Sequence, residues 1–194
     1  IGVLLCINGA GIMNRFVKEL AGNHFSYQQI NQQAASVNAG SDELFVLPFG
    51  NGAERIFNNK IIGSHFLNID LNKHTPSHFY RAAQEGIVFA FKYGFDIMQE
   101  NGMNPSVIRA GKANMFLSDV FTETFVNTIG VAVELYEADG SVGAAKGAGI
   151  GAKIYASAKE AGDYQKRIGV IEPNNIHQYQ SLYQQWLELL SKFL

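Results

Sequence analysis

The segment from Thr75 to Glu100 constrains the fold more than any other part of the chain. Thr75 and Pro76 form a helix start, because a threonine side chain accepts a hydrogen bond from a first-turn N–H and proline lacks only a donor that would be unpaired there. Gly102 and Pro105 end the helix. Small and apolar residues occupy nearly every side of it; they are Phe79, Ala83, Gly86, Val88, Ala90, Phe91, Tyr93, Phe95 and Met98. Such a helix is buried, so we predict that it crosses the centre of the domain.

Short apolar segments alternate with helical patterns along the rest of the chain. The expected strands are 1–8, 44–49, 107–110 and 131–136, and the other expected helices are 11–20, 27–38, 114–128, 141–161 and 174–193. Residues 50–74 show no regular pattern and are predicted to be irregular. This alternation predicts one α/β layered domain with crossover connections.

Two of these helices carry apolar stripes. In the first, Ile12, Phe16 and Leu20 recur at every fourth position. The last has a seam with alternating spacings of three and four, made of Ile176, Tyr179, Tyr183, Trp186, Leu190 and Phe193. A coiled coil is one interpretation of this seam. The seam is shorter than the three or four heptads that a coiled coil requires, so we predict that it packs against its own domain.

Composition excludes several classes of protein. The 194 residues are 47% hydrophobic, which is enough for one substantial core. A formal net charge of −2, with scattered Lys and Arg, leaves no basic surface for nucleic acid or an anionic membrane. No apolar run approaches the ~20 residues that span a bilayer.

The N-terminal run contains the single cysteine. Cys6 lies among apolar residues and is predicted to be a small buried hydrophobe, since one cysteine cannot form an internal disulfide. A reducing cytoplasm is therefore the expected location. Ile1 begins inside a strand-like run without a Met, which indicates a fragment of a longer polypeptide.

Glycines are dense between residues 139 and 152. Gly147, Gly149 and Ala152 match a dinucleotide fingerprint, but they fall inside a predicted helix rather than at its start, where Asp139 and Gly140 already form the turn and Asp139 or Ser141 is the cap. A P-loop is excluded because Lys146 is followed by glycine. The rows Gly143, Gly147, Gly151 and Ala144, Ala148, Ala152, Ala156 predict close helix packing. The alternative is that the helix start borders a nucleotide.

Other polar candidates are predicted to be structural. His74 and His78 flank a helix start without an acidic ligand, so they are interpreted as cap residues and not as a metal site. Glu85 must find a partner inside an apolar helix and is predicted to be a hydrogen-bonding anchor, with a catalytic acid as the alternative. Glu54 and Arg55 are predicted to form an ion pair, with a substrate or subunit contact as the alternative.

Four segments resemble one family. GSHFLNI (63–69) and HFYRAAQEG (78–86) resemble the second signature of the FGGY carbohydrate kinases, except that Asn68 replaces a glycine and Gln84 an aliphatic residue. LPF (47–49), followed by Gly52, Glu54 and Arg55, resembles a segment of the xylulose kinases within that family. VIRAGKANMFL (107–117) resembles the strand, glycine loop and helix around adenosine, and GSVGAAKGAG (140–149) resembles a small-residue helix beside them.

The resemblance implies an α/β fold of the actin-like, ribonuclease-H-like ATPase type. Residues 1–194 would form a single domain, the C-terminal lobe, with a mixed sheet flanked by helices. The general base is expected upstream of residue 1, so no catalytic residue and no metal ligand are assigned within the chain. The partners implied are the N-terminal lobe, which carries most sugar contacts, and a sugar; a homodimer is left open, and no nucleic acid or membrane is expected.

The implied reaction is phosphorylation of a sugar hydroxyl by ATP with Mg²⁺, closest to the conversion of D-xylulose to xylulose 5-phosphate. This chain would supply the nucleotide-binding half and be inactive alone. Glycerol and gluconate are alternative substrates. A non-catalytic actin-like binding module is the alternative from another class.

Five residues are expected to contact the nucleotide. Gly111 allows the backbone to approach adenosine, next to Ala110, and Asn114 is an amide donor and acceptor for the base or ribose. Met115 is expected to line the adenine pocket. Lys112 stands where the family has further glycines, and it either obstructs the nucleotide, as the binding-module alternative requires, or pairs with its phosphates. A simple turn glycine at 111 and a simple helix cap at 114 are the structural alternatives.

Overall fold

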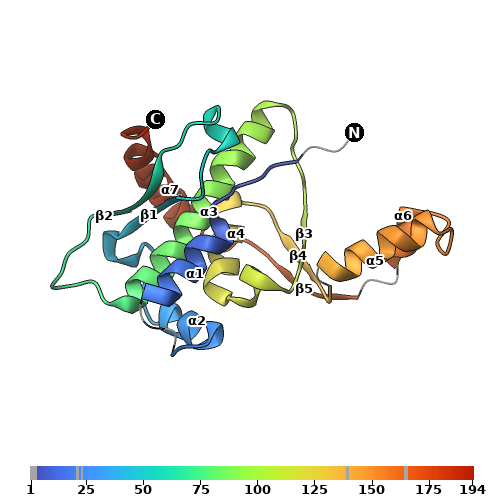
Figure 1. The fold of residues 1–194 in the computed structure, drawn as a ribbon, viewed down its shortest axis with the longest axis horizontal. Coiled ribbons are helices and arrows are strands. Elements are labelled where there is room, and N and C mark those ends of the chain that lie inside the picture. The colour runs from blue at the N-terminus through green and yellow to red at the C-terminus, as the bar shows by residue number, and fades with distance from the viewer. Residues whose placement is uncertain (1–3, 21, 23, 139, 164–165) are drawn as a thin grey trace.

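The computed structural model describes residues 4–20, 22, 24–138, 140–163 and 166–194 (Figure 1). The helices are α1 (Ala10–Leu20), α2 (Tyr27–Ala35), α3 (Pro76–Glu100), α4 (Asp119–Ile129), α5 (Gly140–Gly151), α6 (Ala158–Asp163) and α7 (Ile176–Ser191). The strands are β1 (Phe45–Phe49), β2 (Gly63–Leu67), β3 (Ile108–Gly111), β4 (Val133–Tyr136) and β5 (Arg167–Ile171). Three short 3-10 turns cover Ser41–Glu43, Arg55–Phe57 and Asn114–Leu117.

The strands form two small sheets. β1 and β2 pair antiparallel, with Phe45 opposite Leu67 and Phe49 opposite Gly63. The second sheet has the order β3-β4-β5; β3 and β4 are parallel and β4 and β5 antiparallel. The parallel pair is joined through α4, as a crossover requires. The predicted mixed sheet with flanking helices is therefore confirmed.

Helix α3 runs through the middle of the molecule, as its composition predicts (Figure 1). Every residue from Tyr80 to Ala90 is buried. The helix contacts α1, α2, α4, α7 and β1, so most of the core is assembled on its surface. At its start, the backbone N–H of Thr75 donates to His78 Nδ1 at 3.1 Å, which confirms His78 as a cap residue.

A glycine lets α3 touch β1 directly. A Cβ on Gly86 would lie 2.2 Å from the carbonyl oxygen of Val46, closer than any side chain can come. The same carbonyl accepts a hydrogen bond from Trp186 Nε1 at 2.8 Å. Trp186 is completely buried, so α7 packs against its own domain as predicted.

The chain enters β1 through a left-handed turn. Gly40, Ser41, Asp42 and Glu43 have φ angles of 89°, 48°, 51° and 75°. Each left-handed L-residue costs roughly 1–2 kcal/mol, so the turn needs support from the surrounding structure.

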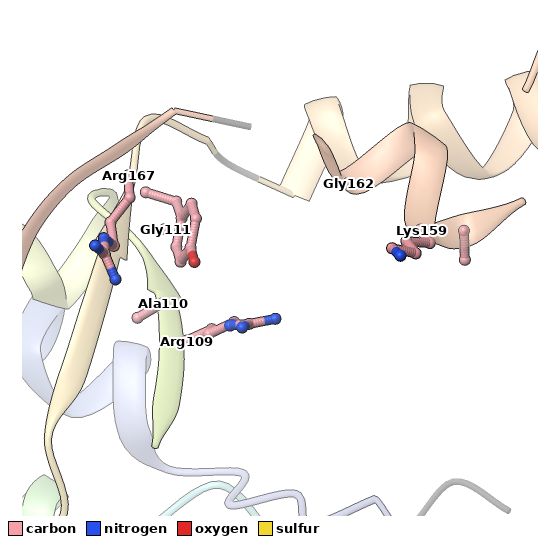
Figure 2. Close-up of a pocket in the computed structure, with 8 residues that line it drawn as sticks. Arg109, Ala110, Gly111, Lys159, Gly162 and Arg167 are labelled. Carbon is pink, nitrogen blue, oxygen red and sulfur yellow. The ribbon is translucent and has the colours of Figure 1, made fainter. Parts of the chain in front are cut away.

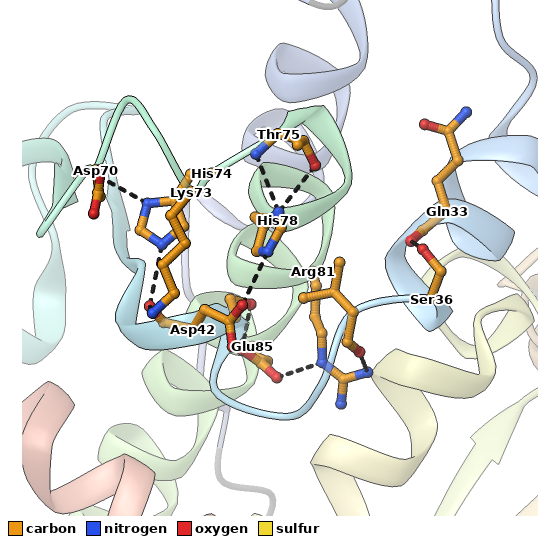
Figure 3. Close-up of polar contacts among 12 residues, drawn as sticks. Gln33, Ser36, Asp42, Asp70, Lys73, His74, Thr75, His78, Arg81 and Glu85 are labelled. Carbon is orange, nitrogen blue, oxygen red and sulfur yellow. Dashed lines mark hydrogen bonds and ion pairs between the residues drawn. The ribbon is translucent and has the colours of Figure 1, made fainter.

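Glu85 of α3 provides that support. Its carboxylate accepts hydrogen bonds from the Gly40 N–H at 2.9 Å and the Ser41 hydroxyl at 2.8 Å. Arg81 donates to it at 2.8 Å and also donates to the carbonyl of Val37 (Figure 3). The prediction that Glu85 is a hydrogen-bonding anchor is confirmed.

Several predicted elements differ in the structure. Residues 4–8 form no strand, and β2 and β5 were not predicted. β2 lacks an alternating pattern and β5 has Gly169 at its centre, so neither shows the usual strand signal. The helix predicted over 141–161 breaks after Gly151 at Lys153, whose φ is 61°. The helix predicted from Asn114 begins at Asp119, after the 3-10 turn.

Two predictions, the burial of Cys6 and the close packing of the glycine row in α5, are wrong. Cys6 is exposed. On α1 the buried residues are Met13, Asn14 and Val17, and the stripe of Ile12, Phe16 and Leu20 lies on the adjacent face of the helix and is exposed. A Cβ on Gly143, Gly147 or Gly151 would meet no described atom within 4 Å, so these glycines make no close helix contact. Ser141 lies within the first turn of α5, and the other expected cap, Asp139, lies outside the described residues.

Replacing Gly86 with Ala is expected to lower the free energy of unfolding by at least about 2 kcal/mol, because the new methyl group would overlap the Val46 carbonyl. Gly147→Ala is the matched control. Its methyl group enters open space, so it should cause no loss and should stabilise α5 by up to ~1 kcal/mol. Urea denaturation followed by circular dichroism measures both, and equal effects of the two changes would contradict the close contact between α3 and β1.

Candidate functional site

Four of the five predicted nucleotide residues are divided between two cavities. Asn114 and Met115 line the larger one, and Ala110 and Gly111 line the smaller one. Lys112 is exposed and lines neither. The turn after β3 separates the two groups, because its direction changes at Asn114, whose φ of 51° is left-handed.

The larger cavity has a volume of about 840 Å³ and lies between α1, α2 and the segment that joins β3 to α4. Five side-chain amides and four larger apolar or aromatic side chains dominate its wall. These are Asn14, Gln28, Asn31, Gln32 and Asn114, and Tyr27, Met115, Leu117 and Val120. Asp119 is the one charged residue among those that line it. The cavity is suited to an uncharged group that is both planar and polar.

A buried acceptor lies in the wall of this cavity. Asn14 is 7% exposed, and its Oδ1 has no hydrogen-bond partner among the described residues. Buried polar atoms are almost always paired, so this oxygen indicates a place for a donor from water or a ligand. Spacing on α1 gave no signal for it, since Asn14 lies on the buried face beside Met13 and Val17.

A chain of hydrogen bonds fixes the side of the cavity near α3. Ser118 donates from its hydroxyl to Gln84 Oε1 at 2.6 Å, and Gln84 Nε2 donates to Asn31 Oδ1 at 3.1 Å. Ser118 also caps α4 by accepting from the Phe121 N–H. Asn114 is therefore not the cap of this helix, and that structural alternative is wrong.

The smaller cavity, about 610 Å³, lies between the ends of β3 to β5 and helix α6 (Figure 2). Three cationic side chains line it: Arg109, Lys159 and Arg167. The Glu134 carboxylate accepts hydrogen bonds from the Tyr136 hydroxyl at 2.7 Å, from Arg167 at 2.7 Å and from Arg109 at 3.0 Å. These bonds lower the pKa of Glu134 to about 2. Both arginines are thus already paired with an anion of the protein.

The remaining candidates are structural. His74 Nε2 lies 3.1 Å from the carbonyl oxygen of Asp42, and His78 Nε2 lies 3.3 Å from its carboxylate, so the two imidazoles hold the left-handed turn (Figure 3). No cluster of three metal-ligating side chains occurs among the described residues.

The predicted ion pair between Glu54 and Arg55 is wrong. Both carboxylate oxygens of Glu54 accept from the backbone N–H of Asn8, at 3.2 and 3.3 Å, because the side chain is fully buried and faces the N-terminal segment rather than its exposed neighbour. Burial raises the pKa of Glu54.

Across the described ranges, no helix is both long and apolar enough to cross a membrane.

No protein-family model matches the chain, but comparisons with known proteins find related sequences and structures. It is 27% identical over 196 residues to the xylulose kinase of Lactococcus lactis, covering 93% of this chain and 37% of the relative. It is 30% identical over 175 residues to the L-xylulose/3-keto-L-gulonate kinase of Escherichia coli, covering 86% and 33%. This chain is a homologue of the FGGY carbohydrate kinases. It spans about a third of the length of these relatives.

Solved structures confirm the fold. The xylulose kinase of Lactobacillus acidophilus superposes with a TM-score of 0.80 at 22% identity, over 95% of this chain and 38% of that one. The gluconate kinase of the same organism gives 0.78 at 21% identity, over 95% and 38%. The glycerol kinase of Plasmodium falciparum with ADP gives 0.75 at 18% identity, over 96% and 37%. The expected actin-like fold of the FGGY kinases is therefore correct.

The lowered pKa of Glu134 predicts a pH dependence that Glu134→Gln should remove. The ionised carboxylate stabilises the fold above the ordinary carboxyl pKa of about 4.3, and this contribution is lost as the pH falls through about 2. The difference in unfolding free energy between wild type and Glu134→Gln should be constant above about pH 5 and shrink towards pH 2. Glu137→Gln is the control, since Glu137 lies 3.9 Å from Lys166 in an exposed pair. A difference for Glu134→Gln that does not change with pH would contradict the assignment.

Proposed function

We propose that this chain is the nucleotide-binding, C-terminal lobe of an ATP-dependent sugar kinase that phosphorylates a hydroxyl of D-xylulose. The observation that carries the proposal is the amide-lined cavity, because it places Asn114 and Met115, two residues predicted to contact adenosine, opposite α1 and α2. The relatives support the choice of sugar, since xylulose kinases occur among both the similar sequences and the similar structures. Gluconate and glycerol are the alternative substrates.

The cavity residues have distinct roles in this proposal. Met115 and Tyr27 cover the faces of the base, because both supply apolar or aromatic surface. Asn114 donates to and accepts from the base or ribose. The unpaired Oδ1 of Asn14 accepts from an N–H of the ligand.

The phosphates extend out of this cavity, since no Lys or Arg lines it. Lys112 is exposed and forms no ion pair with another described residue. We therefore propose that its ammonium group pairs with the ATP phosphates and does not obstruct nucleotide binding. Ala110 and Gly111 end β3 and set the course of the loop that leads to Asn114.

The described residues do not form a Mg²⁺ site, because they contain no cluster of acidic ligands and Asp119 is the one carboxylate in the wall of the larger cavity. We propose that the ATP phosphates and carboxylates outside this chain bind the metal ion. The general base and most residues that contact the sugar would also lie outside this chain. The N-terminal lobe is thus an obligate partner, and the chain alone binds nucleotide without turnover. A cytoplasmic location is part of the same proposal, and a homodimer stays open.

Calorimetric titration of the chain with Mg·ADP tests the proposal. Saturable binding is expected, and Asn114→Gly should weaken it by about 1 kcal/mol, roughly fivefold, through loss of the amide. Glycine is chosen because it keeps the left-handed backbone at this position. Asn72→Ala, in the loop before α3, is the control and should bind like the wild type.

Absence of saturable binding would contradict the proposal and favour the non-catalytic module. Equal binding of Mg·ADP by Asn114→Gly and wild type would indicate that adenosine does not bind in this cavity. The choice of sugar is tested separately, by assaying the full-length polypeptide with ATP and D-xylulose, gluconate or glycerol.

A further inference from the structure

We propose that Gln84 is a positioning residue for the larger cavity: it turns the Asn31 side chain so that the N–H groups of Asn31, and not its oxygen, face the ligand. Gln84 is fully buried in α3 and is not one of the residues that line the cavity. Its effect therefore passes through Asn31, which lies in the cavity wall on α2. The inference rests on the proposed function only for the identity of the ligand.

Ser118 is 2% exposed and lies at the N-terminus of α4. Its oxygen accepts the N–H of Phe121 as a helix cap, at 3.4 Å. Its hydrogen must then find an acceptor, because an unpaired buried donor is costly. Gln84 Oε1 lies 2.6 Å away and is that acceptor.

This contact decides the orientation of the Gln84 amide. With its oxygen towards Ser118, the Gln84 nitrogen must face Asn31, and Nε2 lies 3.1 Å from Asn31 Oδ1. The two ends of an amide have nearly the same shape, so the hydrogen-bond network determines which is which. The reverse orientation would place the NH₂ group against Ser118, whose hydroxyl hydrogen has no other acceptor among the described residues.

The orientation of Asn31 follows from that of Gln84. Its oxygen is engaged by Gln84, so its NH₂ group is directed to the cavity that it lines. No described acceptor is hydrogen-bonded to this nitrogen. The cavity therefore presents donors at Asn31, and it selects a ligand group with a hydrogen-bond acceptor, such as a ring nitrogen of a base or a hydroxyl oxygen of a ribose.

Gln84 is one of the two positions at which the chain departs from the FGGY signature that it resembles. An aliphatic side chain there could not fix the rotation of an amide. The relay through α2, α3 and α4 ties the helix that begins after the Asn114 turn to the opposite wall of the cavity.

The test is hydrogen exchange of side-chain amides, measured by NMR on the ¹⁵N-labelled chain without ligand, followed by titration with Mg·ADP. In the wild type the Gln84 NH₂ protons should be protected and those of Asn31 should exchange at least tenfold faster. Gln84→Met removes the relay with little change of volume, so ADP binding should weaken about 3- to 10-fold. Gln32→Met, an exposed change in the same cavity wall, is the control and should leave the Asn31 signals unchanged.

The second variant is Asn31→Asp, at a position that is half-buried. The aspartate keeps an oxygen acceptor for Gln84 and replaces the NH₂ donors of Asn31 by a second oxygen. It should weaken ADP at least as much as Gln84→Met, and the double variant should be no worse than Asn31→Asp alone. Protected Asn31 protons in the wild type, or additive losses in the double variant, would overturn the positioning role. Expected exchange rates without any binding of ADP would support the orientation of Asn31 and overturn the proposed function instead.

Discussion

The rest of the core depends on the hydrogen bonds that the buried carboxylate of Glu85 accepts. It accepts hydrogen bonds from Arg81 in its own helix and from Gly40 and Ser41 in the left-handed turn. Arg81 is held in turn by Tyr179 of α7, whose pKa burial raises to about 12, so that the phenol is neutral when it accepts the guanidinium N–H. This network fixes the angle at which the chain enters β1, and β1 then lies directly against Gly86.

The same helix organises the larger cavity. Gln84 is adjacent to Glu85 in the sequence but points towards α2 and α4, because successive residues of a helix lie about 100° apart. Glu85 therefore supports the turn before β1, and Gln84 joins Asn31 to Ser118. Both polar residues are tolerated inside an apolar helix because each of their side chains has its partners. The walls of the cavity and the core beneath it are thus set by one helix.

Patterns with many equivalent positions could be predicted from the sequence, and single long-range contacts could not. The sequence predicts helix α3 because nearly all its sides are apolar, and it predicts the anchoring role of Glu85 because a charge inside such a helix needs a partner. The hydrogen-bonded relay through Gln84 could not be predicted, since Asn31 and Ser118 lie 53 and 34 residues from Gln84 in the sequence and no helical or strand periodicity relates them. The prediction of close helix packing from the glycine row in α5 is wrong, because small residues permit close packing without requiring a neighbour. Asn114 and Met115 were brought to one cavity, and Ala110 and Gly111 to another, by a change of backbone direction that composition does not reveal.

The left-handed turn also bears on the order in which the chain acquires structure during synthesis. Ser41 and Glu85 are 44 residues apart, so Ser41 leaves the ribosome well before the carboxylate that holds it. The turn is unfavourable without that partner, and β1 cannot take its final place against an absent helix. We expect residues 40–49 to stay extended and accessible to chaperones until α3 has been translated, after which the turn, the strand and the helix form together.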